Sequence, residues 1–131
     1  MIHESTASRA ASMTGRLNFL NTGATGNAAV RVYEAPRPAT SADTPTSTML
    51  VSIPLDDPAG AVVGATLELA QLDPGLILNT GIAAWVRVVN KNGDTAFDMD
   101  AGATGSEAEC ILSQTTLYAG GQVSILSAVL G

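Results

Sequence analysis

Three aspartates around one predicted hairpin are the residues best placed to bind a metal ion. Asp98 and Asp100 lie two residues apart on a predicted strand and therefore point to the same face, and Asp94 precedes them. Carboxylate oxygens are hard ligands that suit calcium, but the spacing lacks the EF-hand pattern. Such residues are also typical of the solvated face of a hairpin. We therefore expect no metal ion and no cofactor, with calcium as the alternative.

Residues for nucleophilic or acid–base catalysis are scarce. His3 is the single histidine and lies in a terminus, and Cys110 is embedded in an alternating apolar stretch that is typical of a buried thiol. The glycine loops at Gly23–Gly26 and Gly102–Gly105 lack the Lys-Ser/Thr of a phosphate-binding loop and are interpreted as turns. Catalysis requires titratable groups that converge in a pocket. The sequence therefore predicts a protein that is not an enzyme.

Aromatic side chains offer one further kind of site. Tyr33, Trp85 and Tyr118 could form a platform for a sugar ring. Trp85 lies in the most apolar stretch of the chain, which favours a buried position in a central strand. We therefore expect Trp85 to stabilise the core rather than to bind a ligand.

The elements that must position these residues are mostly strands. Alternating and β-branched apolar runs separated by Gly, Pro and Asn turns predict about seven or eight strands. The main ones are Ala29–Tyr33, Met49–Leu55, Ala61–Leu69, Ile82–Val89, Thr95–Met99, Ala108–Leu112 and Val123–Leu130, with a short apolar stub within Leu72–Leu78. Turns are expected at Asp56–Pro58 and, because of its Asn-Gly step, at Asn90–Gly93. The fold class predicted is mainly β, a β-sandwich or jelly-roll-like barrel.

A helix is predicted at the amino terminus, from Ser5 to Leu20. Its apolar residues Ala10, Met13, Leu17 and Leu20 recur at helical spacing. The alternative is a short strand after Gly15, since a glycine within a helix costs about 1 kcal/mol. Periodicity favours the helix.

Composition sets the class of the protein. Its 131 residues suit one domain, 1–131, with an N-terminal arm and helix over 1–22 and an extended loop rich in Pro, Ser and Thr over 35–47. The net charge of −6 disfavours binding to nucleic acid. No apolar run is long enough to span a bilayer, and the first residues do not resemble a signal peptide. We expect no membrane partner and synthesis in the cytoplasm.

Several segments resemble small structural proteins encoded among the virion genes of tailed bacteriophages and prophages. The resemblance is carried by Val30–Thr40, with its tyrosine and its Arg-Pro-Ala-Thr loop, by Met49–Leu55, Ala83–Val88 and Gly102–Cys110, and by Ala119–Ile125. The loop departs from the family pattern where Ser41 replaces a proline. The resemblance implies a virion component, and its motifs are structural rather than catalytic.

The leading hypothesis is a capsid decoration or cement protein located in the virion, which binds the major capsid protein and copies of itself. The alternatives are a tail or receptor-adsorption module and a head-to-tail adaptor. Contacts with neighbouring subunits are expected on the apolar stripe of the helix and on the proline-rich loop. The interface residues predicted are Met13, Leu17, Leu20, Tyr33, Pro36, Arg37, Pro38 and Pro45.

Overall fold

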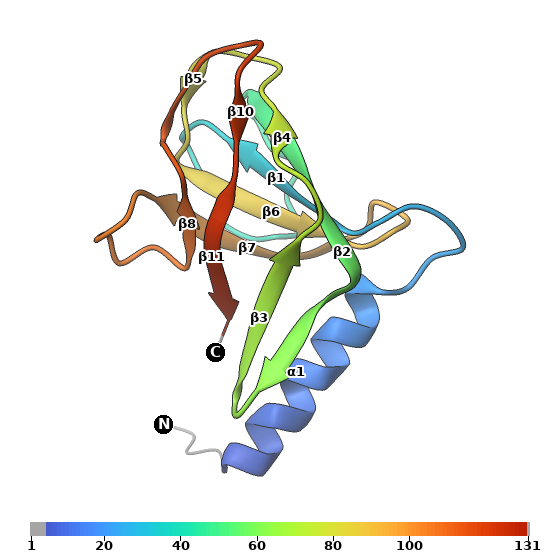
Figure 1. Cartoon of the computed structure of the whole chain (residues 1–131). Helices are drawn as coiled ribbons and strands as arrows, with labels where there is room; N and C mark the ends of the chain where they lie inside the picture. The colour runs from blue at the N-terminus through green and yellow to red at the C-terminus, as the bar shows by residue number, and fades with distance from the viewer. Residues whose placement is uncertain (1–4, 131) are drawn as a thin grey trace.

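The computed structural model describes residues 5–130 and shows a mainly β protein with 44% strand and 12% helix. Seven strands close into a barrel in the order β1-β2-β3-β11-β8-β7-β6 (Figure 1). The predicted fold class is therefore confirmed, and of the architectures expected the barrel is the one found. The elements are α1 (Thr6–Leu20), β1 (Ala29–Tyr33), β2 (Met49–Val63), β3 (Thr66–Gln71), β4 (Gly75–Leu76), β5 (Gly81–Ile82), β6 (Trp85–Val89), β7 (Thr95–Gly102), β8 (Cys110–Leu112), β9 (Thr116–Leu117), β10 (Gln122–Val123) and β11 (Ile125–Leu130).

Alternation along the strands determines which side chains fill the barrel. Val30 and Val32 of β1 pair in register with Val88 and Val86 of β6, and all four are fully buried. The intervening residues point to the outer face, where Tyr33 is paired with Trp85. These β-branched side chains therefore form part of the core that the barrel encloses.

The β2–β3 hairpin differs from the prediction. Strand β2 continues through Asp56–Pro58, where a turn was predicted, and the chain reverses after Val63 instead. Gly60 makes this possible, because β2 is irregular between Leu55 and Gly60 and a Cβ at Gly60 would collide with the carbonyl of Glu68. The predicted strand Ala61–Leu69 is in fact the two arms of the hairpin tip.

Other strand boundaries also differ from those predicted. The predicted strand Ile82–Val89 is divided at Ala83 and Ala84 into β5 and β6, and Val123–Leu130 is divided at Ser124 into β10 and β11. The hairpin predicted at Asn90–Gly93 is confirmed, with β6 and β7 antiparallel on either side of it. Gly93 supplies the positive φ of 84° that this turn requires.

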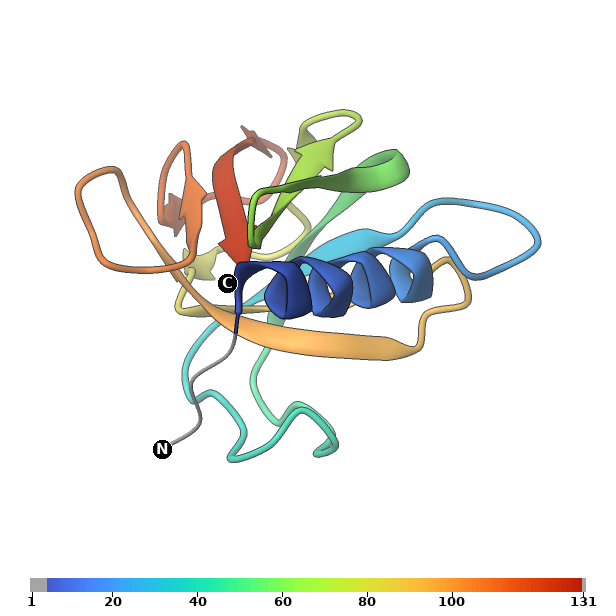
Figure 2. The same ribbon diagram turned by 90° about the horizontal axis from the view of Figure 1, so that it is seen from below.

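Helix α1 lies across one end of the barrel (Figure 2). Ser5 caps it by accepting a hydrogen bond from the amide of Ser8. The helix contacts β2, β3 and β7. Met13 and Leu20 are buried against the barrel, and Leu17 packs partly buried against the same core. The helix therefore forms as predicted, and its apolar stripe closes the barrel.

Two short ladders cover the end of the barrel away from the helix (Figure 1). Strand β4 pairs with β10, and β5 pairs with β9. They insert Ile77, Leu117 and Val123 into the core from that end. The sequence predicted an apolar stub here but not the ladders.

Candidate functional site

An aromatic pair lies on the outer face of the barrel, beneath the proline-rich loop. Tyr33 and Trp85 are cross-strand neighbours, and their rings stack with centroids 4.5 Å apart at an angle of 12°. Trp85 is fully buried, and its Nε1 donates hydrogen bonds to the carbonyl of Glu34 at 2.9 Å and to Oγ of Ser47 at 3.3 Å. Both rings are therefore covered by their own chain. The expectation that Trp85 is buried is confirmed.

A buried ion pair lies beside the aromatic pair. Arg87 on β6 is directly opposite Asp98 on β7, and its Nε and Nη2 donate to the two carboxylate oxygens at 2.8 and 3.0 Å. The two side chains are only 6% and 3% exposed. The hydrogen bonds to Asp98 raise the pKa of Arg87 above its ordinary value, although burial acts in the opposite direction. The guanidinium also lies 5.5 Å from the ring centroid of Trp85.

The loop over residues 35–47 is held down by this cluster. Nη1 of Arg87 donates to the carbonyl of Asp43 at 2.8 Å. Arg37 forms a more exposed ion pair with Asp100 at 2.7 Å. The loop therefore folds back on its own barrel, and the carbonyl of Asp43 accepts from the Nη1 donor of Arg87 that Asp98 does not engage.

These contacts correct much of the predicted interface. Met13, Leu20 and Tyr33 are buried inside the chain and cannot present a free surface, because the helix closes the barrel and Trp85 covers the tyrosine ring. Leu17 is half-buried for the same reason. Of the predicted loop residues, Pro36 and Arg37 are exposed, and Pro38 and Pro45 are half-buried.

The three aspartates considered for calcium do not converge. Both carboxylate oxygens of Asp98 accept hydrogen bonds from Arg87, and Asp100 is paired with Arg37. The amide of Asp94 is tied to the side chain of Asn90 in the exposed hairpin turn. Across residues 5–130, no three His, Cys, Asp or Glu side chains are arranged to hold a metal ion. The spacing is compatible with ligation, but the carboxylates of Asp98 and Asp100 form ion pairs with arginines instead.

The remaining chemical candidates are placed as follows. Cys110 is fully buried, and burial raises the pKa of its thiol to about 12. It therefore stays protonated at neutral pH and lacks the thiolate character of a nucleophile. Tyr118 follows β9 and is 66% exposed, whereas Tyr33 and Trp85 are buried and stack on each other, so the three rings offer no common exposed platform. His3 lies outside the described residues.

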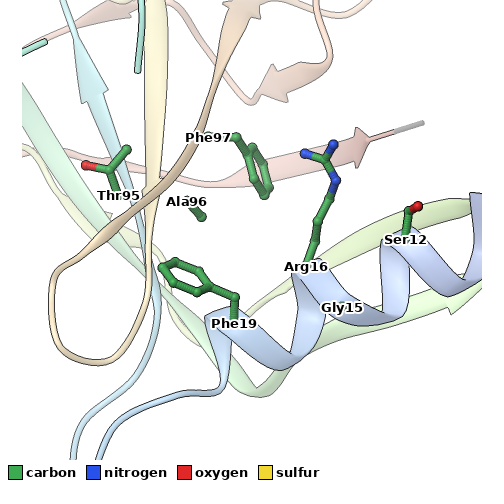
Figure 3. A pocket seen from close by; sticks show the side chains of 7 residues that line it. All are labelled: Ser12, Gly15, Arg16, Phe19, Thr95, Ala96 and Phe97. Atoms are coloured by element: carbon green, nitrogen blue, oxygen red, sulfur yellow. The ribbon is translucent and has the colours of Figure 1, made fainter. Parts of the chain in front are cut away.

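An open groove of about 550 Å³ runs between α1 and β7 (Figure 3). Phe19 and Arg16 line it from the helix, and Ala96 and Phe97 line it from the strand. Its other lining residues are Ser12, Gly15 and Thr95. Among these lining residues, Arg16 is the one charged side chain, and Phe19, Ala96 and Phe97 supply the apolar surface. None of the lining residues is an Asp, Glu, His, Cys or Lys that could act with Arg16 in catalysis. The groove has the chemistry of a contact surface.

Four exposed large apolar side chains lie on or next to the strands of the two ladders. We call Leu76, Leu78, Ile82 and Tyr118 the apolar end; their exposed fractions lie between 55% and 66%. Leu76 and Leu78 flank the buried Ile77, so alternation turns them outward.

Hydrogen bonds from backbone amides bring the segments of the apolar end together. The amide of Ile77 donates to the carbonyl of Gly121, and the amide of Ala119 donates to Oγ1 of Thr80. Gly81 pairs with Leu117. The apolar end was missed in the sequence, where the same residues resemble interior positions of strands.

A signal that could have revealed the apolar end is the distribution of charge. No Asp, Glu, Lys, Arg or His occurs from Pro74 to Val86 or from Ile111 to Leu130. These two stretches contain both ladders. The two stretches therefore contribute none of the charged side chains, although the carboxylate of Glu34 from the end of β1 lies against Gly81 of β5.

Comparison with models of known protein families, with curated proteins and with solved structures gave no match. Within the described part of the chain, no helix is long and apolar enough to cross a membrane. Function is therefore inferred from the residues and their geometry.

Proposed function

We propose that this chain is a structural component of a bacteriophage particle, a capsid decoration protein that docks on neighbouring virion proteins and performs no chemistry. The observation that carries the proposal is the apolar end. Large apolar side chains exposed together mark interaction surfaces in soluble proteins, and Leu76, Leu78, Ile82 and Tyr118 are each more than half exposed.

The use of the ionic groups supports an assembly role. Arg87, Asp98, Arg37 and Asp100 hold the loop to the barrel, so they are occupied by internal contacts. These charged side chains, which a reaction could otherwise use, hold the loop over residues 35–47 rigidly on the barrel. A rigid surface loses little conformational freedom when a partner docks on it.

A closed barrel suits a subunit that must assemble through specific contact surfaces. Its seven barrel strands close on themselves, which leaves little free strand edge in the barrel, and the strands of the two ladders outside it are only two residues long. Contacts with neighbours then depend mainly on side chains at the ends and on the loops.

The bacteriophage context comes from the resemblance of Val30–Thr40 and Met49–Leu55 to virion proteins. A decoration protein binds the assembled shell and not its free subunits, and so stabilises the shell by mass action. The partners proposed are the major capsid protein and copies of this chain.

The proposal is tested by adding the purified chain back to particles that lack it. Wild-type protein is expected to bind to saturation. Leu76→Ser/Tyr118→Ser is expected to lower the affinity at least tenfold, because it removes apolar surface from the contact.

Val63→Ser is the matched control, since Val63 is 53% exposed at the tip of the β2–β3 hairpin. It is expected to bind like the wild type. Equal binding by the double variant would contradict docking through the apolar end, and failure of the wild-type chain to bind would contradict the proposed function.

A further inference from the structure

We propose that the free edge of β7 binds an extended peptide segment of a neighbouring protein by β-strand addition, and that this segment carries a carboxylate for Arg16. The proposal goes beyond the proposed function, because it assigns a second surface and the chemistry of what binds there. It rests on how β7 is paired and on what lines the groove between α1 and β7.

Strand β7 is fully paired on one side only. It is eight residues long and pairs with β6 from Thr95 to Asp100, whereas it pairs with β8 only through Ala101 and Gly102. Within residues 5–130, no strand lies beside Thr95–Asp100 on the side away from β6. An unpaired strand edge presents backbone amides and carbonyls at the spacing that another strand requires.

The backbone of Asp98 faces this free side. The amide of Ala101 donates to the carbonyl of Ala84 beside β6, so alternation turns the backbone groups of Asp98 away from β6. In agreement, the carbonyl of Asp98 accepts from Nη2 of Arg37 at 3.3 Å. Asp98 is half-buried as a residue although its side chain is only 3% exposed, so the surface that it shows to solvent is main chain.

Two hollows adjoin the free edge. One is the groove of about 550 Å³ on the α1 side, and the other, of about 210 Å³, is lined by Arg37–Ser41 of the proline-rich loop and by Asp98. Phe97 lines both. Figure 2 shows β7 in orange between the helix and this loop. A strand added to β7 would therefore point its side chains alternately toward the helix and toward the loop.

The groove determines which side chains fit on the helix side. Phe19 is 40% exposed and, together with Phe97, offers apolar walls for a large apolar side chain (Figure 3). Arg16 is exposed, and within residues 5–130 no carboxylate pairs with it. A cation beside apolar walls is complemented by a partner that brings a carboxylate and apolar groups on one face.

An extended segment matches this surface better than a helix does. The backbone groups of a helix are bonded within the helix, so a helical partner would leave the outward amide of Asp98 unpaired. Strand addition pairs that amide through the backbone and selects the sequence through alternate side chains.

The test is an NMR titration of the full chain with the capped peptide Thr-Phe-Ser-Glu-Thr-Phe-Ser. In an extended peptide its two phenylalanines and its glutamate share one face, in the same order from either end, so both strand directions bring the carboxylate to the groove. The amide signals of Asp98, Asp100 and Phe19 are expected to shift, and exchange of the Asp98 amide proton is expected to slow.

Two N-methylated peptides test the backbone contact. Methylation of the Thr and Ser amides blocks antiparallel pairing with Asp98, and methylation of the Phe and Glu amides blocks parallel pairing, while the side chains stay the same. One of the two is expected to bind at least tenfold more weakly than the parent peptide, and the other to bind like it. Equal binding of all three peptides would contradict strand addition.

Arg16→Glu tests the charge contact. It is expected to weaken binding at least tenfold, and a peptide with lysine in place of glutamate is expected to restore binding to this variant. Phe19→Ser is expected to weaken binding as well. Leu72→Ser is the matched control, because Leu72 is 48% exposed and lies outside the groove. Trp85 fluorescence confirms that each variant is folded.

Three results would overturn the proposal: no shifts at about 1 mM peptide, where even weak binding is detected, unchanged affinity in Arg16→Glu, or equal weakening in Leu72→Ser. The two proposals fail separately. A chain that occupies the particle but binds no peptide would remove this inference alone. Peptide binding by a chain that never binds the particle would remove the proposed function alone.

Discussion

Replacing Asp98 with alanine is expected to lower the free energy of unfolding by about 3–5 kcal/mol, because it leaves the buried Arg87 guanidinium without its counter-ion. The expected fall in melting temperature is about 10–20 °C for a domain of this size. Thermal unfolding followed by circular dichroism measures it.

Asp100→Ala is the matched control for the Asp98 prediction. Asp100 is on the same strand and also pairs with an arginine, but its side chain is 61% exposed and that of Arg37 is 41% exposed. Exposed pairs contribute about 0–1 kcal/mol. Equal destabilisation by the two substitutions would show that burial of the Arg87 pair has no energetic consequence.

Replacing both partners distinguishes a buried charge from a packing defect. Arg87→Met/Asp98→Leu is expected to be more stable than Asp98→Ala alone, because it leaves no unpaired charge in the interior. Chemical denaturation measures the difference. A double variant less stable than Asp98→Ala would mean that the hydrogen bond from Arg87 to the carbonyl of Asp43 contributes more to stability than removal of the unpaired buried charge does.

Trp85→Ala is expected to cost about 3–5 kcal/mol, the usual range for removing a large buried aromatic side chain. It removes the ring that stacks on Tyr33 and the Nε1 donor that bonds to the carbonyl of Glu34 and to Oγ of Ser47. Chemical denaturation followed by circular dichroism measures the loss.

Trp85→Phe separates the two contributions of the tryptophan. Phenylalanine keeps an aromatic ring beside Tyr33 but cannot donate to the carbonyl of Glu34. We expect a loss of about 1–3 kcal/mol, typical of a buried polar group left without its partner. A melting temperature unchanged in Trp85→Ala would contradict the packing described for this face.

Local patterns were sufficient to predict several elements. Strand β1 was predicted with the bounds found, because Val30 and Val32 alternate cleanly between two turns. The helix and the Asn90–Gly93 hairpin were predicted correctly for the same reason. In each case the deciding interactions join residues close together in the sequence.

Non-local contacts account for most errors. The loop was expected to extend toward neighbouring subunits, and nothing near Asp43 in the sequence indicates that its carbonyl accepts a hydrogen bond from Arg87, 44 residues away. Met13 and Leu20 were expected to face a partner, since periodicity identifies the apolar side of a helix but not what covers it.

The contact between Arg87 and Asp98 could have been predicted from the sequence. Counting outward from the Asn90–Gly93 turn places Arg87 close to Asp98 on the facing strand, and the structure pairs them directly. The apolar end was harder to predict. Leu76 and Ile82 lie in ladders of two residues each, and burial in such short strands depends on the whole barrel.

The central claim is that this chain belongs to a bacteriophage shell, and its copy number per particle tests that claim most directly. Quantitative gel densitometry or mass spectrometry of purified virions gives the ratio to the major capsid protein. Decoration predicts hundreds of copies, as closed symmetric shells require. About a dozen copies would indicate a head-to-tail adaptor and a small number at the tail an adsorption module, and either result, or absence from the particle, would contradict the account.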